Sequence, residues 1–292
     1  STSKTITMQN GARLSVQGAV NPTVNTSTGY KLLRVGTGPQ TIDIPLSNQS
    51  LTLDDGGQFG TSAGATITKS GAGVLVLGND YGALIGANTS INVTGGILRL
   101  QTNANAFGST EKGSIALVGG NLDLRLNNGG TFGNNVTVSS NATITTGRTT
   151  AAATDITLVM GNLSIGEVTL TSANGNGNTA PGVASLSFND TTFTGSPTFD
   201  VTNANGAGVG TLSLGSVIEV GGSRSLTTSG AGSMVIGGDA LYTGNTTVTG
   251  GRLTIFGAAA TTGNISVTGN GSLLALRGAI NTPASINNIT VG

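Results

Sequence analysis

The stretch Ile91-Asn92-Val93-Thr94-Gly95-Gly96-Ile97-Leu98-Arg99-Leu100 consists of two short runs of alternating apolar and polar residues joined by a pair of glycines. The same arrangement returns in Ile115-Ala116-Leu117-Val118-Gly119-Gly120-Asn121-Leu122-Asp123-Leu124. Alternation with a period of two indicates half-buried β-strands. Glycine adopts the backbone conformations that a tight corner needs. The repeating unit is therefore strand, glycine corner, strand.

This unit recurs at steps that match one coil of a solenoid. The corner at Gly95 returns at Gly119, and the corner at Gly250 returns at Gly269. Further copies occupy 6–16, 136–145, 246–255 and 265–276. A repeat of this length suits a β-solenoid, in which each unit buries its apolar face against its neighbours. We predict an all-β parallel β-helix of about a dozen coils, forming one domain over residues 1–292.

A β-sandwich or up-and-down barrel is the competing fold. In such folds turn signals recur at strand-length spacing, whereas the glycine corner recurs here at coil-length steps. The part of the chain at about 150–210 is less regular. There, 174–178 and 203–206 are predicted to be exposed loops, as is 22–30, and these loops are candidate contact surfaces.

The composition excludes several classes of protein. The chain contains 49 Gly, only 8% charged and 3% aromatic residues, and no Cys, His or Trp. Twelve basic and twelve acidic residues give a net charge of zero, without a basic run that would neutralise phosphates, so we expect no nucleic-acid partner. The apolar runs are far too short for a membrane-spanning helix. The first residues lack the charged and apolar regions of a signal peptide, so we expect a mature product or an excised segment.

Two segments resemble a known repeat. The first comprises 69–81 with the glycine pair at 93–98, and the second comprises 229–236 followed by 242–253. Both are similar to the passenger-associated repeat of bacterial autotransporters, which runs K-x-G-x-G-x-L-x-L, then Y-x-G-x-T-x-V, then G-G-x-L. The second segment matches nearly throughout, whereas the first contains extra residues at 81–88. The resemblance implies a right-handed β-helix exported to the bacterial cell surface, with a role in adhesion, display or a surface layer.

Candidate sites are few. The absence of His and Cys excludes His-based triads, thiol nucleophiles and ordinary zinc sites. The adjacent carboxylates Asp54 and Asp55 are weak candidates for a metal site, and a turn is the preferred interpretation because Gly56 and Gly57 follow them. Asp80 and Asp239 are also expected to form Asx turns. We therefore expect no cofactor and no enzymatic activity.

Four arginines follow the glycine corners, namely Arg99, Arg125, Arg252 and Arg277. On one outer face they would form a surface for anionic glycans. The preferred interpretation is that they are solvated residues which hinder lateral aggregation.

Neither end of the sequence shows a helix or a charged cap, and uncapped solenoids associate through their ends. We therefore expect a structural protein that self-associates, as a head-to-tail filament, into a fibre, sheath or surface layer. The alternatives are an adhesin passenger segment that binds host or glycan ligands and, less favoured, a β-helical enzyme acting on polysaccharide. Such an enzyme needs converging carboxylates.

Overall fold

The computed structural model describes residues 4–18, 21, 23–24, 30–54, 59–150, 155–175, 177, 182–203, 209–259, 263–278 and 289–292. The chain divides into two compact units, Ser1–Thr137 (unit 1) and Val138–Gly292 (unit 2). Within the described residues the only helical element is one turn of 3-10 helix, η2 (Gly82–Leu84). No helix in this part of the chain has the length and apolar character to cross a membrane.

Each coil of unit 1 has up to three faces, which the chain visits in order. The first face contains β1 (Lys4–Met8), β4 (Tyr30–Val35) and β7 (Phe59–Thr61). The second contains β2 (Arg13–Ser15), β5 (Gly38–Asp43), β8 (Ala65–Ser70), β10 (Ser90–Val93) and β12 (Ser114–Leu117). The third contains β3 (Thr23–Val24), β6 (Ser50–Leu53), β9 (Val74–Leu77), β11 (Ile97–Gln101) and β13 (Asn121–Arg125). Two further strands follow, β14 (Gly130–Thr131) and β15 (Val136–Val138).

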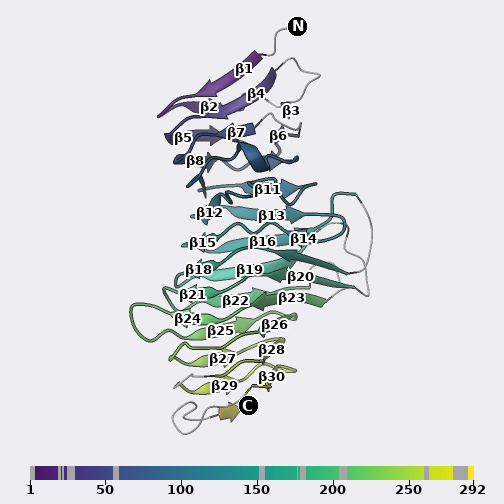
Figure 1. Cartoon of the computed structure of the whole chain (residues 1–292). Helices are drawn as coiled ribbons and strands as arrows, with labels where there is room; N and C mark the ends of the chain where they lie inside the picture. Colours follow the sequence, from purple (N-terminus) through teal and green to yellow (C-terminus); the bar gives the residue numbers. More distant parts are fainter. Residues whose placement is uncertain are drawn as a thin grey trace. The chain divides into compact units, whose positions relative to one another are not determined.

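Unit 2 repeats the three-faced coil. Its first face contains β17 (Ile156–Val159), β20 (Val183–Ser187), β23 (Val209–Leu214), β26 (Ser233–Ile236), β28 (Arg252–Ile255) and β30 (Leu273–Leu276). Its second face contains β18 (Leu163–Ile165), β21 (Thr191–Phe193) and β24 (Val217–Glu219). Its third face contains β16 (Ala142–Gly147), β19 (Thr169–Asn174), β22 (Thr198–Val201), β25 (Leu226–Ser229), β27 (Thr246–Val248), β29 (Ile265–Val267) and β31 (Ile289–Val291). Figure 1 shows the strands of this face stacked one beneath the next.

The strand register confirms the predicted parallel β-solenoid. Ile91 of β10 pairs with Ile67 on one side and with Ile115 on the other, so two successive coils there have the same length. The coil that leads from Val248 to its partner Val267 is shorter. The coil that leads from Thr169 to its partner Thr198 is longer. Coil length is therefore more variable than the sequence period suggests, because the corners differ in length.

Stacking at constant register places like residues above one another in the interior. Leu53, Leu77, Leu100 and Leu124 form one such column on the third face of unit 1, and each is fully buried. Burying a Leu side chain stabilises a fold by roughly 1.5–3 kcal/mol relative to exposure. These columns supply the core of each coil.

The second glycine of the pair is required by the corner itself. Gly96 has φ +63°, and a methyl group on it would overlap the carbonyl oxygen of Gly73 in the preceding coil. Gly251 in unit 2 has φ +59° and the same relation to the carbonyl oxygen of Gly232. Both the left-handed conformation and the close approach exclude a side chain.

One interior column contains a lysine. Lys69 lies between Ile42 and Val93 and is fully buried. Its Nζ donates hydrogen bonds to the carbonyl oxygens of Ser70 (2.9 Å), Gly71 (2.9 Å) and Gly95 (3.0 Å). Burial lowers the pKa of Lys69 to about 8, and attraction by the Asp43 carboxylate opposes that shift. Lys69, the first residue of the first resemblance segment, therefore stabilises the corner from inside the coil through these hydrogen bonds.

The loop predictions are only partly covered by the described residues. The strands β17 to β22 lie within 150–210. Much of 22–30, 174–178 and 203–206 lies outside the described residues. The single domain over 1–292 stays a prediction, although both units are built on the same coil.

Candidate functional site

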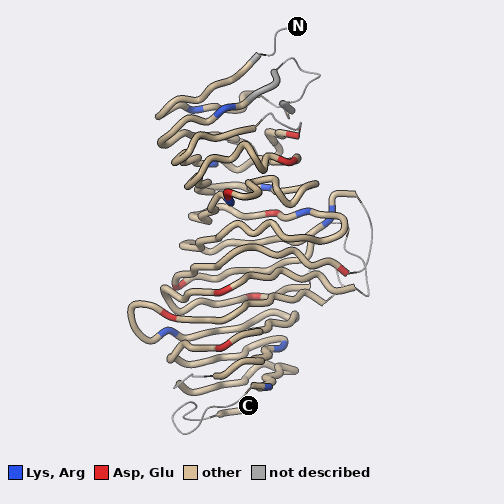
Figure 2. Tube along the Cα trace, viewed as in Figure 1, with Lys and Arg blue, Asp and Glu red and all other residues tan. Residues whose placement is uncertain are grey.

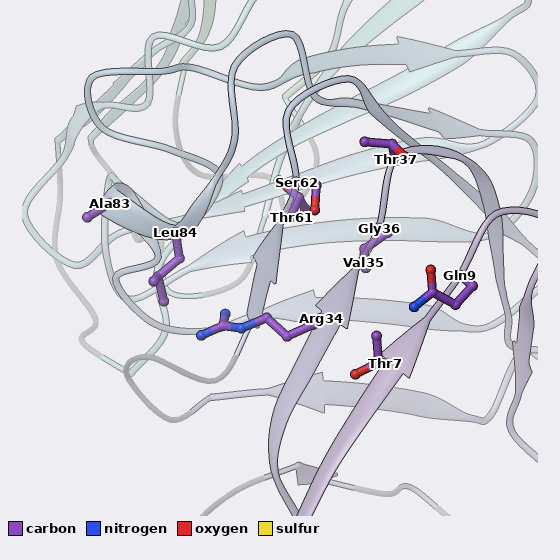
Figure 3. Close-up of a pocket in the computed structure, with 10 residues that line it drawn as sticks. All are labelled: Thr7, Gln9, Arg34, Val35, Gly36, Thr37, Thr61, Ser62, Ala83 and Leu84. Carbon is purple, nitrogen blue, oxygen red and sulfur yellow. The ribbon is translucent and has the colours of Figure 1, made fainter.

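A groove of about 470 Å³ runs over the first face of unit 1. Its polar lining comes from Thr7 and Gln9 within or after β1, from Arg34 of β4, and from Thr37, Thr61 and Ser62. Val35, Ala83 and Leu84 supply the apolar part, together with Gly36. Figure 3 shows Arg34 extending from its strand toward the segment that carries Leu84.

The position of Arg34 is determined by its neighbours in the adjacent coils. Thr7, Arg34 and Gly60 occupy one register position on the outer surface. A methyl group on Gly60 would overlap Nη1 of Arg34, so the glycine provides the space in which the guanidinium lies. Leu33 and Val35, on either side of Arg34 in sequence, point inward and are buried. Alternation therefore directs Arg34 outward into the groove.

The wall formed by η2 is held by hydrogen bonds. Oδ1 of Asp80 accepts from the backbone N–H of Gly82 (2.8 Å), and its Oδ2 accepts from the side-chain amide of Asn105 (3.1 Å). The first of these bonds, and then the second, keep the pKa of Asp80 below its ordinary value. Tyr81 is buried behind the wall, edge-on to Phe59 with ring centroids 5.6 Å apart. The Asx turn predicted at Asp80 thus helps to fix one side of the groove.

Thr61 is also fixed. Its Oγ1 accepts the backbone N–H of Gly86 (2.9 Å) and shares a hydrogen bond with Oγ1 of the buried Thr89 (2.8 Å). By contrast Thr7, Gln9, Thr37 and Ser62 are exposed. Their hydroxyl and amide groups face solvent at the groove.

Arg34 differs from the other basic residues. Among the Lys and Arg side chains that the structure describes, it alone has no hydrogen bond, ion pair or ring contact. Figure 2 shows charged residues thinly scattered along the coils. No acidic residue lines the groove in the described part of the chain.

Several carboxylates are engaged by hydroxyl groups of the adjacent coils. Asp43 accepts from Ser15 of the preceding coil (3.1 Å), from Ser70 of the following coil (2.7 Å) and from Arg13 (2.7 Å). Burial alone would raise the pKa of Asp43, but the hydrogen bonds from Arg13, Ser70 and Ser15 hold it below its ordinary value. Such a carboxylate holds neighbouring coils together.

Asp200 in unit 2 repeats the arrangement, accepting from Ser229 (3.2 Å) and Thr171 (3.5 Å). Asp239 accepts the backbone N–H of Ala258 in the following coil (2.8 Å), and not one in its own turn. The Asx turn predicted at Asp239 is therefore wrong, because parallel stacking brings a donor from the next coil to the carboxylate.

Two of the four corner arginines lie in each unit. Arg99 and Arg125 lie on the third face of unit 1, where both bind Asp123 (2.7 Å and 2.9 Å). Arg252 lies on the first face of unit 2, and Arg277 follows β30, with its guanidinium carbon 5.7 Å from the ring centre of Phe256.

The weak metal candidates remain untested. Asp54 is exposed just after β6, and its carbonyl oxygen accepts from the side chain of Asn79 (2.7 Å). Asp55 lies outside the described residues. Among the residues that are described, no group of three or more His, Cys, Asp or Glu side chains is placed to hold a metal ion.

A second groove, of about 490 Å³, lies on the first face of unit 2. Gly232 and Gly251 form part of its lining, and the partly exposed Val183, Val209 and Leu273 make it more apolar than the first groove. The one cation among its described lining residues, Arg252, donates to Thr254.

Sequence reasoning missed Arg34. The available signal was an arginine in the outward position of an alternating run, one coil before a glycine in Phe59-Gly60-Thr61. Recognising that signal requires knowledge of how strands of successive coils pair.

Comparison with known protein families finds no match, and comparisons with curated proteins and with solved structures find none either.

Proposed function

We propose that this chain is an extracellular structural protein of a bacterial surface, a right-handed β-helical scaffold of the autotransporter-passenger type. In this role it self-associates into a fibre, sheath or surface layer. The observation that carries the proposal is the stacking itself. Parallel strands stacked in constant register make the marginal strand of a sheet a template for another coil of the same geometry.

Open edges support association. Within the described residues, the strands at the margins of the sheets, among them β1, β7, β14 and β30, each pair on one side only. Unpaired backbone N–H and C=O groups on such strands readily pair with another chain. The net charge of zero adds to this tendency, because copies of the chain do not repel one another over long range.

Light scattering and negative-stain microscopy of the full chain across the micromolar range test the proposal. We expect the mean mass to rise with concentration and elongated particles to form. Monodisperse monomers throughout that range would contradict it.

One matched pair of variants sharpens the test. The backbone N–H of Gly292 donates to Val267, so the N–H of the exposed Val291 points away from β29, toward the open side of β31. Val291→Pro removes that outward donor and should reduce association, while Val291→Thr keeps it and should not. Equal association of both variants would exclude this edge.

A second candidate function, that of an adhesin segment binding glycans, is favoured by the groove that contains Arg34. A polysaccharide-acting enzyme receives less support, since in the described residues neither groove is lined by a carboxylate.

A further inference from the structure

We propose that the groove over β1, β4 and β7 binds the carboxylate of an acidic sugar of the uronic acid class, and that Arg34 is the residue that recognises this carboxylate. The proposal concerns binding by a single chain and does not depend on self-association.

Charge defines the chemical class. In the described part of the groove Arg34 is the one charged side chain, and it has no described partner. The site therefore offers one positive charge, which one carboxylate neutralises. A phosphate group carries about −1.5 to −2 charges at neutral pH and would be left partly uncompensated. The planar guanidinium also matches the two oxygens of a carboxylate in a bidentate arrangement.

The remaining lining suits a sugar. Exposed hydroxyl and amide groups of Thr7, Gln9, Thr37 and Ser62 lie around the guanidinium, and these groups both donate and accept hydrogen bonds, as sugar hydroxyls do. The volume of about 470 Å³ lies within the range of small-molecule sites, which is roughly 300–1,000 Å³. No aromatic ring lines the described groove, so the sugar is held by its polar groups and not by stacking.

Preorganisation favours binding over mere exposure. The guanidinium lies over Gly60, Thr61 is tied to Gly86, and the η2 wall is anchored by Asp80. Because Thr61 and the η2 wall are already ordered, little conformational entropy is lost from these groups when a ligand enters. The walls of the groove are thus in place without a ligand, and the charge of Arg34 is free to bind an anion.

Calorimetric titration of the full chain with an oligogalacturonate tests the proposal. The matched ligand control is the same oligosaccharide with its carboxylates fully methyl-esterified. We expect the acid to bind and the ester to bind at least tenfold more weakly. Salt at about 1 M, where the screening length is about 3 Å, should weaken binding of the acid.

Variants assign the effect to Arg34. Arg34→Gln should weaken binding roughly tenfold to a hundredfold, as expected for loss of hydrogen bonds to a charged group. Thr7→Glu alters an exposed residue at the register position beside Arg34 and supplies an internal carboxylate, so it should abolish binding without removing Arg34. Arg277→Gln in unit 2 is the control and should bind as the parent does. Circular dichroism confirms that each variant is folded.

The outcomes are separable. Equal binding of acid and ester, unchanged affinity in Thr7→Glu, or no binding at millimolar oligogalacturonate would each overturn the proposal. If inorganic phosphate displaced the sugar at a lower concentration than free galacturonate does, the ligand class would be wrong. If Arg34→Gln did not fold, Thr7→Glu would still decide. Because these titrations do not measure assembly, a failure to bind the sugar would not contradict the scaffold proposal. A failure to self-associate would likewise not contradict the binding proposal.

Discussion

Replacing Lys69 by methionine is expected to destabilise unit 1 even though methionine is more apolar. The substitution leaves the carbonyl oxygens of Gly71 and Gly95 without a donor in the interior, whereas the carbonyl oxygen of Ser70 keeps the backbone N–H of Ile44 (3.1 Å). Each buried polar group left unsatisfied costs about 1–3 kcal/mol. Methionine regains part of this loss, because the pKa of Lys69 is lowered from 10.5 to about 8. That shift corresponds to about 3 kcal/mol against the charged form. For two such carbonyl groups, the net loss of unfolding free energy at neutral pH should be about 1 kcal/mol.

The pH dependence of stability separates the cost of burying the Lys69 charge from the gain of its hydrogen bonds to carbonyl groups. Because the folded-state pKa of Lys69 lies below the unfolded value, the unfolded chain binds more protons between pH 8 and pH 10.5. Stability conferred by Lys69 should therefore rise through this window, by up to about 3 kcal/mol, and stay constant below pH 8. Lys69→Met lacks this rise, so the gap between parent and variant should widen with pH.

Urea unfolding followed by far-ultraviolet circular dichroism measures both effects. Tyrosine fluorescence is unsuitable, because tyrosine ionises in the same pH range. Lys69→Thr, which reproduces the residue at the matching position 228 beside the second resemblance segment, serves as a second uncharged variant. Parallel curves of stability against pH for the parent and Lys69→Met would refute the lowered pKa. A variant as stable as the parent at neutral pH would refute the role of the three carbonyl bonds.

Two further predictions concern stability, and a third concerns the ionisation of a buried tyrosine. Gly96→Ala should lower the urea midpoint more than Gly64→Ala does. Both glycines have a positive φ, which costs a residue with a side chain about 1–2 kcal/mol. Only at Gly96 would the added methyl group also meet backbone atoms, because the space at Gly64 is open. Equal midpoints would show that conformation alone matters. Asp43→Asn should destabilise the protein at neutral pH. The stability that Asp43 contributes should be fully present above its unfolded pKa of 3.8 and be lost as the pH falls through its lower folded pKa. The melting temperature should therefore fall more steeply with decreasing pH for the parent than for the variant. Burial raises the pKa of Tyr242 well above its ordinary value, against the smaller effect of its hydrogen bond with Thr246. Ultraviolet titration of the folded protein should therefore show fewer than its three tyrosines ionised at a pH where an exposed tyrosine would be ionised. Tyr242→Phe should lower the number of tyrosines that stay protonated by one.

Much of the fold could be predicted because its signals are local. The glycine pairs at 95–96 and 119–120 mark the corners, where Gly96 and Gly119 have a positive φ that disfavours side chains, and the flanking alternation shows which residues point inward. The spacing of these corners equals the coil length in that part of the chain, since Ile97 does pair with Asn121. Where corners are longer, as between Thr169 and Thr198, the sequence spacing underestimated the coil.

The candidate site could not be predicted in the same way. Arg34 and Gly60 lie in successive coils, and nothing local relates them. The pairing of Arg99 with Asp123, which removes Arg99 from any free cationic surface, likewise depends on two successive coils coming into register. The four corner arginines looked equivalent in sequence because each follows the same motif.

The sequence by itself determined that the chain coils, since alternation and glycine corners act through backbone geometry over short distances along the chain. Only the tertiary structure decided what each coil places next to its neighbours. It buried Lys69 among carbonyl groups, paired Asp43 with hydroxyls above and below, and left Arg34 over a glycine without a described partner. The physical reason is register. Which side chains meet between one coil and the next depends on the length of every corner between them, and that length appears only when the coils are stacked.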